Sequence, residues 1–152
     1  MASRDISEEI IEDLYAEALL LADDARSVFD LRMGGEAEEA SDLLKIALSI
    51  EGLRTTTRVM HVLAWLLNQR AYFSGELSES QLRRHNALPD ERLADPANLE
   101  LLEPETRELI HESERLHARV ARLDRDWRQQ REAASPPVQA LQGRIAQAFG
   151  QR

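Results

Sequence analysis

The chain has 152 residues, of which 31% are charged and 43% hydrophobic, and its formal net charge is -9 at pH 7. This length suits one domain with its own core, and the lack of cysteine excludes thiol catalysis, disulfide scaffolds and cysteine-based zinc sites. The acidic balance argues against nucleic acid as a partner, because phosphate groups are held by clustered Lys and Arg. The N-terminal segment MASRDISEEI has no apolar core, so we expect no membrane anchor and a cytoplasmic location.

The first predicted helix starts at a capping-box pattern formed by Asp5 and Glu8. Gly34 and Gly35 are expected to end it, because glycine readily takes the left-handed conformation that closes a helix. Its apolar residues recur at helical spacing: Ile11, Leu14, Ala18, Leu21, Ala25 and Val28.

The second predicted helix runs from about residue 36 to Phe73 and ends at Ser74 and Gly75. Gly52 lies inside it, which a close helix approach would explain, as would simple tolerance in a long helix. One row of positions alternates spacings of three and four, as in a heptad seam: Leu43, Ile46, Ile50, Leu53, Thr57, Met60, Ala64, Leu67 and Ala71. Between Val59 and Leu67, further apolar residues lie off that row. A helix that is apolar on all sides must be covered on all sides, so we expect neighbouring helices and a second copy of the chain to bury it.

A capping box at Ser78 and Gln81 opens a short polar helix. The connection from Ala87 to Glu103 is expected to be irregular, with one helical turn started by Asp95 and Pro96. Its leucines favour a course along the protein body: Leu93, Leu99, Leu101 and Leu102.

The third long helix is expected to begin at Pro104 and to end before Pro136 and Pro137. Its predicted seam comprises Leu109, Ser113, Leu116, Val120, Leu123 and Trp127. No strand pattern occurs, so the predicted fold is all-α: an antiparallel three-helix bundle over residues 1–135 with short extra helical turns, followed by a C-terminal tail over 136–152. The tail is basic and carries Val138, Leu141, Ile145 and Phe149 at helical spacing, so it could fold on a partner or pack back on its own bundle.

The pairs Glu108 with His111 and Glu114 with His117 have the Glu-x-x-His spacing of ferritin-like di-metal carboxylate proteins. Both copies share one helix and lie six residues apart, which at about 100° per residue turns them roughly 240° away from each other. A single metal site cannot use both Glu-x-x-His pairs. A charged helix face exposed to solvent explains the four residues without any metal. His61 has no oriented partner in the sequence, and the threonines at 55–57 can bond to their own helix. We therefore expect no enzyme activity, no metal and no cofactor.

The segment GLRTTTRVMHVLAWLLNQRAYFSGEL at 52–77 resembles the signature of the RcdA family of alphaproteobacteria, the regulators of CtrA degradation. The matching residues are Arg54, Thr56, Arg58, Met60, Trp65, Leu66, Leu67, Arg70, Ala71, Gly75 and Glu76. Weaker agreement extends to the first helix and to the C-terminal segment SPPVQALQGRIAQAF, whereas residues 85–102 and most of the third helix do not match.

This resemblance implies a protease adaptor: a homodimeric three-helix bundle with a flexible tail that recruits cargo to the ClpXP protease. By resemblance, the tail would dock on the ClpX unfoldase primed by a CpdR-type receiver protein. The adaptor would present cargo or a cyclic-di-GMP-binding adaptor that delivers CtrA, and it could gather at a cell pole. We expect the protease-side contacts to be Val138, Leu141, Arg144, Ile145 and Phe149. A structural dimer without a protease role and a di-metal protein remain alternatives.

Overall fold

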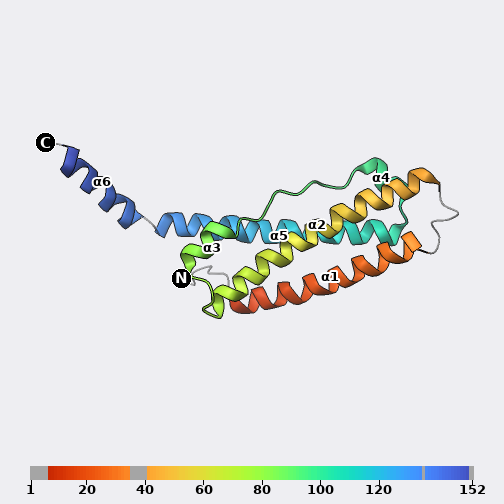
Figure 1. Ribbon diagram of the computed structural model, residues 1–152, viewed down its shortest axis with the longest axis horizontal. Coiled ribbons are helices and arrows are strands. Elements are labelled where there is room, and N and C mark those ends of the chain that lie inside the picture. The colour runs from red at the N-terminus through yellow and green to blue at the C-terminus, as the bar shows by residue number, and fades with distance from the viewer. Residues whose placement is uncertain (1–6, 35–40, 135, 151–152) are drawn as a thin grey trace.

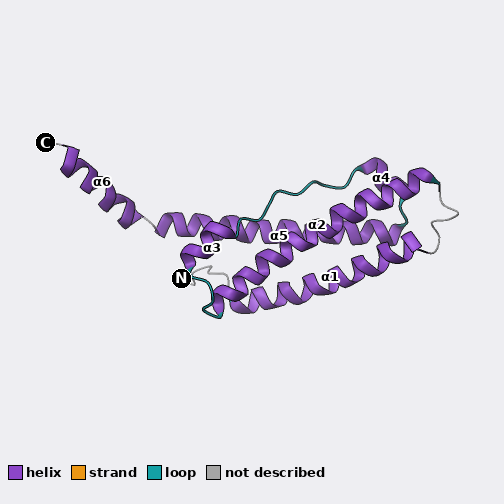
Figure 2. Ribbon diagram, viewed as in Figure 1, coloured by secondary structure: helices purple, strands orange, loops and turns teal. Residues whose placement is uncertain are grey.

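A computed structural model describes residues 7–34, 41–134 and 136–150, and every regular element in these ranges is a helix (Figure 2). The long helices α1 (Glu8–Gly34), α2 (Asp42–Phe73) and α5 (Pro104–Ala134) form an elongated bundle (Figure 1). Three shorter helices accompany them: α3 (Glu79–His85), α4 (Pro96–Leu101) and α6 (Pro136–Gly150). The predicted all-α bundle with short extra turns is confirmed. Within these ranges, no helix is both long enough and apolar enough to cross a membrane.

Helix α1 buries the apolar row that the sequence predicted. Five of its six positions are buried, and Val28 is partly buried against the core. Phe29 completes this face. The predicted cap at Asp5 lies outside the described residues; Ser7 Oγ accepts a hydrogen bond of 3.2 Å from the Ile10 amide and so satisfies one free donor of the first turn.

Helix α2 begins one residue after Ser41, whose hydroxyl accepts a hydrogen bond of 3.2 Å from the Leu44 amide. The sequence predicted an earlier start, and residues 35–40 lie outside the described ranges. The helix ends as predicted at Ser74, after which Gly75 adopts a left-handed φ of 83°.

The prediction that the three long helices are antiparallel holds for α1 and α2 but is wrong for α5 relative to α2. Arg58 of α2 bonds to Ser113 of α5, and Trp65 bonds to Asp124, so the two helices run parallel. Helix α1 is antiparallel to both. The chain achieves this because residues 74–103 return along the bundle before α5 starts (Figure 1).

The returning segment between α3 and α4, residues 86–95, is held to α2 by polar bonds at successive turns. Asn86 accepts from Asn68 Nδ2 at 3.0 Å and donates to the Trp65 carbonyl at 3.3 Å. The Arg92 carbonyl accepts from Arg58 at 2.8 Å, and the Asp95 amide donates to Glu51 at 3.3 Å. We call residues 86–95 the strap.

Apolar contacts contribute less to the strap and to α4 than the sequence suggested. Leu102 is buried and Leu99 is partly buried, whereas the other two leucines expected against the body, Leu93 and Leu101, are exposed. Their exposure is possible because hydrogen bonds to α2, together with partly buried Leu88 and Ala94, hold the strap in place.

Helix α6 follows α5 directly and projects beyond the end of the bundle (Figure 1). The tail is therefore helical over Pro136–Gly150, and it does not pack back along the bundle. All of its described side chains, from 141 to 150, are exposed.

Candidate protein-binding site

The heptad seam of α2 is open to solvent in the single chain. Leu53 is 70% exposed, Met60 is 58% exposed and Leu67 is 47% exposed. Every seam position from 43 to 67 is exposed: Leu43, Ile46, Ile50, Leu53, Thr57, Met60, Ala64 and Leu67. Neither α1 nor α5 covers this seam, so of the covering expected for α2 only a second copy of the chain is left for it, and that part stays a prediction. We call these eight residues the α2 seam.

The opposite face of α2 fills the core, and it is unusually polar. Val59, Val62, Trp65 and Leu66 are buried there, as the off-seam apolar residues require. The same buried face also carries Glu51, Gly52, Thr55, Arg58 and Gln69. The helix thus has apolar residues on both faces, and four polar side chains stand among its buried ones, unlike an ordinary surface helix with one polar face.

Gly52 permits the close approach of α1 and α2. A Cβ atom built at Gly52 would lie 3.0 Å from Cδ1 and 3.3 Å from Cγ of Phe29. The close approach considered from the sequence is confirmed, and the ring of Phe29 causes it.

Two of the buried polar residues of α2, Arg58 and Glu51, bond to groups far away in the chain. Arg58, with no exposed surface, donates to Ser113 Oγ and to the Arg92 carbonyl, both at 2.8 Å. Glu51 accepts from Arg54 and Asn98, both at 2.9 Å. Sequence reasoning did not identify Glu51, Asn98 or Arg92, because nothing in their local pattern signals a partner more than 30 positions away.

The residues that carry the family resemblance fall into several environments. Arg58, Trp65 and Leu66 lie in the core, whereas Thr56, Met60 and Leu67 lie on the exposed side of α2. Arg54 is partly exposed and pairs with Glu51. The remaining four stand at the end of α2 or just after it: Arg70, Ala71, Gly75 and Glu76.

Arg70 joins α2 to the start of α1. Its Nε donates to Glu12 Oε1 at 2.7 Å, and its guanidinium lies 4.3 Å from the centre of the Tyr15 ring. The hydrogen bond to the Glu12 carboxylate raises the pKa of Arg70 above its usual value. The side chain is already charged at any physiological pH, so this contact orients two helices without acting as a pH switch.

The predicted tail residues form a second exposed surface. Leu141, Ile145 and Phe149 are 56%, 48% and 81% exposed and recur every fourth position, which places them on one face of α6. Arg144 is also exposed. Val138 belongs to the same helix, and its side chain lies outside the described set.

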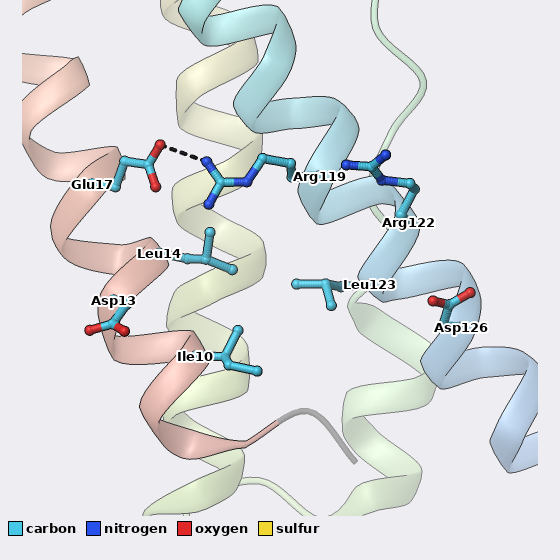
Figure 3. A pocket seen from close by; sticks show the side chains of 8 residues that line it. All are labelled: Ile10, Asp13, Leu14, Glu17, Arg119, Arg122, Leu123 and Asp126. Atoms are coloured by element: carbon cyan, nitrogen blue, oxygen red, sulfur yellow. Dashed lines mark hydrogen bonds and ion pairs between the residues drawn. The ribbon is translucent and has the colours of Figure 1, made fainter. Parts of the chain in front are cut away.

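A groove between α1 and α5 offers a third surface (Figure 3). Leu14 and Leu123 point toward each other across it, and Arg119 donates to Glu17 at 2.8 Å from the opposite wall. This part holds about 470 Å³ and is lined by Ile10, Asp13, Leu14, Glu17, Arg119, Arg122, Leu123 and Asp126. A further 400 Å³ continues the groove and shares Glu17 and Arg119.

The Glu-x-x-His residues of α5 are dispersed among separate contacts. Glu108 pairs with Arg115 at 2.7 Å, and His111 lies 3.2 Å from Glu114. His117 Nε2 lies 3.1 Å from the Pro89 carbonyl of the strap. No group of three or more His, Asp or Glu side chains suited to a metal occurs within the described ranges.

His61 has a partner that the sequence did not reveal. Its Nδ1 lies 2.6 Å from Glu91 Oε1 of the strap, and the Glu91 carboxylate is 4.0 Å from His117. These two histidines therefore sit on either side of one strap residue, where they fasten the strap to α2 and α5.

Comparison with known proteins gives one result. Residues 2–149 match the family described as "Protein of unknown function (DUF1465)". The chain belongs to the DUF1465 family. No curated protein and no solved structure matches it. Because the match covers nearly the whole chain, the bundle and α6 are both parts of this DUF1465 protein.

Proposed function

We propose that this DUF1465 protein is an adaptor that brings cargo to the ClpXP protease in regulated proteolysis, as its resemblance to the RcdA family implies. The observation that carries the proposal is the presence of two separate unpartnered apolar surfaces, the α2 seam and the face of α6. An adaptor needs two docking surfaces and no catalytic group, because it works by raising the local concentration of cargo at the protease.

In this proposal, α6 is the protease-side surface. It projects from the bundle, exposes Leu141, Ile145 and Phe149, and contains no acidic residue. An amphipathic helix of this kind suits a hydrophobic groove on a partner. The partner is the ClpX unfoldase primed by a CpdR-type receiver protein, and the cargo side receives CtrA or a cyclic-di-GMP-binding adaptor. This role places the protein in the cytoplasm, with concentration at a cell pole.

The α2 seam is proposed to hold a second copy of the chain. It extends over 25 residues from Leu43 to Leu67, or roughly 36 Å at 1.5 Å per residue. That span covers more than three heptads, and two such seams can pack as knobs into holes in a coiled coil. A two-fold homodimer then buries the same apolar row on both copies.

A purified degradation assay tests the proposal: ClpXP, a CtrA-type cargo and the receiver protein, with and without the full chain. We expect cargo to disappear faster only when both the chain and the receiver are present. Ile145→Asp combined with Phe149→Asp should abolish this acceleration, whereas Gln147→Asp, on the other side of α6, should retain it. Equal activity of the two variants would contradict the assignment of α6.

The α2 seam also supports a second candidate function, a purely structural homodimer. Sedimentation of Leu53→Glu/Met60→Glu tests the seam: the variant should stay fully helical and form smaller assemblies than the wild-type chain, while Gln129→Glu on exposed α5 keeps the wild-type size. A chain that dimerises through the seam and yet never accelerates proteolysis would favour the structural role over the adaptor.

A further inference from the structure

The groove between α1 and α5 has the length of a helix of 15 residues. Its lining extends along α1 from Ile10 to Asp24, which corresponds to roughly 21 Å of helix axis. Helix α6 contains 15 residues, or roughly 22 Å at the same rise. The groove is therefore long enough to take all of α6 along its floor.

The groove offers apolar anchor points at both ends. Ile10 is 43% exposed at the end near the α1 N-terminus, and Leu20 is 69% exposed toward the other end. Partly buried Leu123 lies between α1 and α5 on the floor. An occupant with apolar residues on one face, such as α6 with Leu141 and Ile145, would cover these side chains.

The charges of the groove and of α6 are complementary. The two parts of the groove are lined by five carboxylates and three guanidiniums, and two of the guanidiniums are already paired, Arg119 with Glu17 and Arg115 with Glu108. Asp13 and Asp126 flank the end shown in Figure 3. Helix α6 has Arg144 and no acidic residue, so it brings a positive charge to a groove in which carboxylates outnumber guanidiniums.

The length of the α5–α6 connection determines whether α6 can enter the groove of its own chain or that of a second copy. Helix α5 ends at Ala134 and α6 begins at Pro136, so a single residue separates them. Antiparallel helices in bundles are joined by about 2–8 residues, and a proline restricts the residue before it as well as itself. The α6 helix therefore points away from the groove of its own chain (Figure 1). When a connection is too short for an element to fold back on its own chain, two copies can exchange that element.

We propose that α6 of one copy docks in the α1–α5 groove of a second copy, and that two chains exchange this helix reciprocally. Exchange gives each groove a fourth helix and buries the apolar face of α6 without bending the α5–α6 junction. The groove lies between α1 and α5 and the α2 seam faces away from both, so the two surfaces do not compete. This exchange has a regulatory consequence, which rests on the proposed function: an α6 helix held in the groove of another copy is hidden from the protease.

Disulfide trapping tests the exchange directly, since the chain has no cysteine of its own. Two full-length chains of different tag length are mixed under mild oxidation, one carrying Leu20→Cys and the other Ile145→Cys, both in the Leu53→Glu/Met60→Glu background. With the midpoint of α6 over Glu17, Ile145 lies level with position 19 of α1 if the two helices run parallel and with position 15 if they run antiparallel. Leu20→Cys therefore tests the parallel arrangement, and Asp13→Cys replaces it in a second pair of chains that tests the antiparallel one. We expect a mixed disulfide of intermediate size at least tenfold faster than with Gln147→Cys in place of Ile145→Cys.

Three outcomes would overturn the proposal. One is equal trapping by the Ile145→Cys and Gln147→Cys chains. Another is trapping only within single chains that carry both Leu20→Cys and Ile145→Cys, because it would place α6 in its own groove. The third is a mixed disulfide that persists when Leu14→Asp is added, provided that circular dichroism shows an intact helical bundle. None of these readouts uses the protease, so failure of the adaptor proposal and failure of the exchange are separable.

Discussion

The guanidinium of Arg58 lies inside the core and donates a hydrogen bond of 2.8 Å to the hydroxyl of Ser113, 55 positions away. Its second bond, to the Arg92 carbonyl, fixes the strap to the same point. Arg58 therefore connects α2, α5 and the strap. A buried cation without a carboxylate partner depends on such neutral acceptors to offset its loss of hydration.

We expect Arg58→Ala to lower the free energy of unfolding by about 2–4 kcal/mol, since it removes a large buried side chain and two charge-assisted hydrogen bonds. Chemical denaturation followed by circular dichroism measures the loss. Arg26→Ala is the matched control, because that side chain is 81% exposed and its pair with Asp30 should contribute less than about 0.5 kcal/mol. Similar losses in both variants would contradict the structural role of Arg58.

Gly52→Ala is predicted to destabilise the bundle even though alanine favours a helix. The new methyl group would stand 3.0 Å from the Phe29 ring, and the resulting repulsion should exceed the helix-propensity gain of about 1 kcal/mol. Gly143→Ala in α6 is the control, because nothing lies within 4 Å of its added methyl group. That change should raise helicity. The double variant Gly52→Ala/Phe29→Leu should recover part of the loss in thermal unfolding.

Gly75→Ala tests the backbone at the end of α2. No atom would obstruct the added methyl group, but φ is 83°, so the cost is conformational and should be about 1–2 kcal/mol. Gly75→Asn should cost less, because asparagine enters the left-handed region more readily. An alanine variant as stable as the wild type in thermal unfolding would contradict this account of the residue.

Trp65→Phe should lower stability by about 1–3 kcal/mol, because it leaves the buried Asp124 carboxylate without its indole donor at 3.1 Å. Asp124 would keep only its contact with Arg128. Trp127→Phe is the comparison: it is also buried, but its indole nitrogen has no hydrogen bond to any described residue. A larger denaturation midpoint change for Trp127→Phe than for Trp65→Phe would go against this explanation.

Much of the fold could be predicted from local pattern. Helical spacing gave the buried faces of α1 and α5, and proline, glycine and capping residues gave the start of α5 at Pro104 and the capping box at Ser78. These features depend on residues only a few positions apart in the sequence, so the spacing of residues along the chain predicts them well.

The orientation of α2 could not be predicted in this way. A heptad row looks the same whether the partner is a helix of the same chain or of another, so periodicity cannot tell which face of α2 its own chain buries. The true core face looked polar, because Glu51, Arg58 and Gln69 are typical of surfaces. Their burial depends on the strap, on Asn98 and on Ser113, and those contacts arise only once the chain has folded.

The parallel direction of α2 and α5 has a consequence for synthesis on the ribosome. Helices α1 and α2 are close in sequence and can pair early, yet the part of the α2 core face that α5 covers stays exposed until residues 104–127 have emerged. The acceptors that Arg58 and Trp65 need, Ser113 and Asp124, come last. The nascent hairpin would thus present apolar surface on both sides of α2 for some seconds, at about 5–20 residues per second. A chaperone that binds exposed apolar helices could bind the nascent chain during that interval.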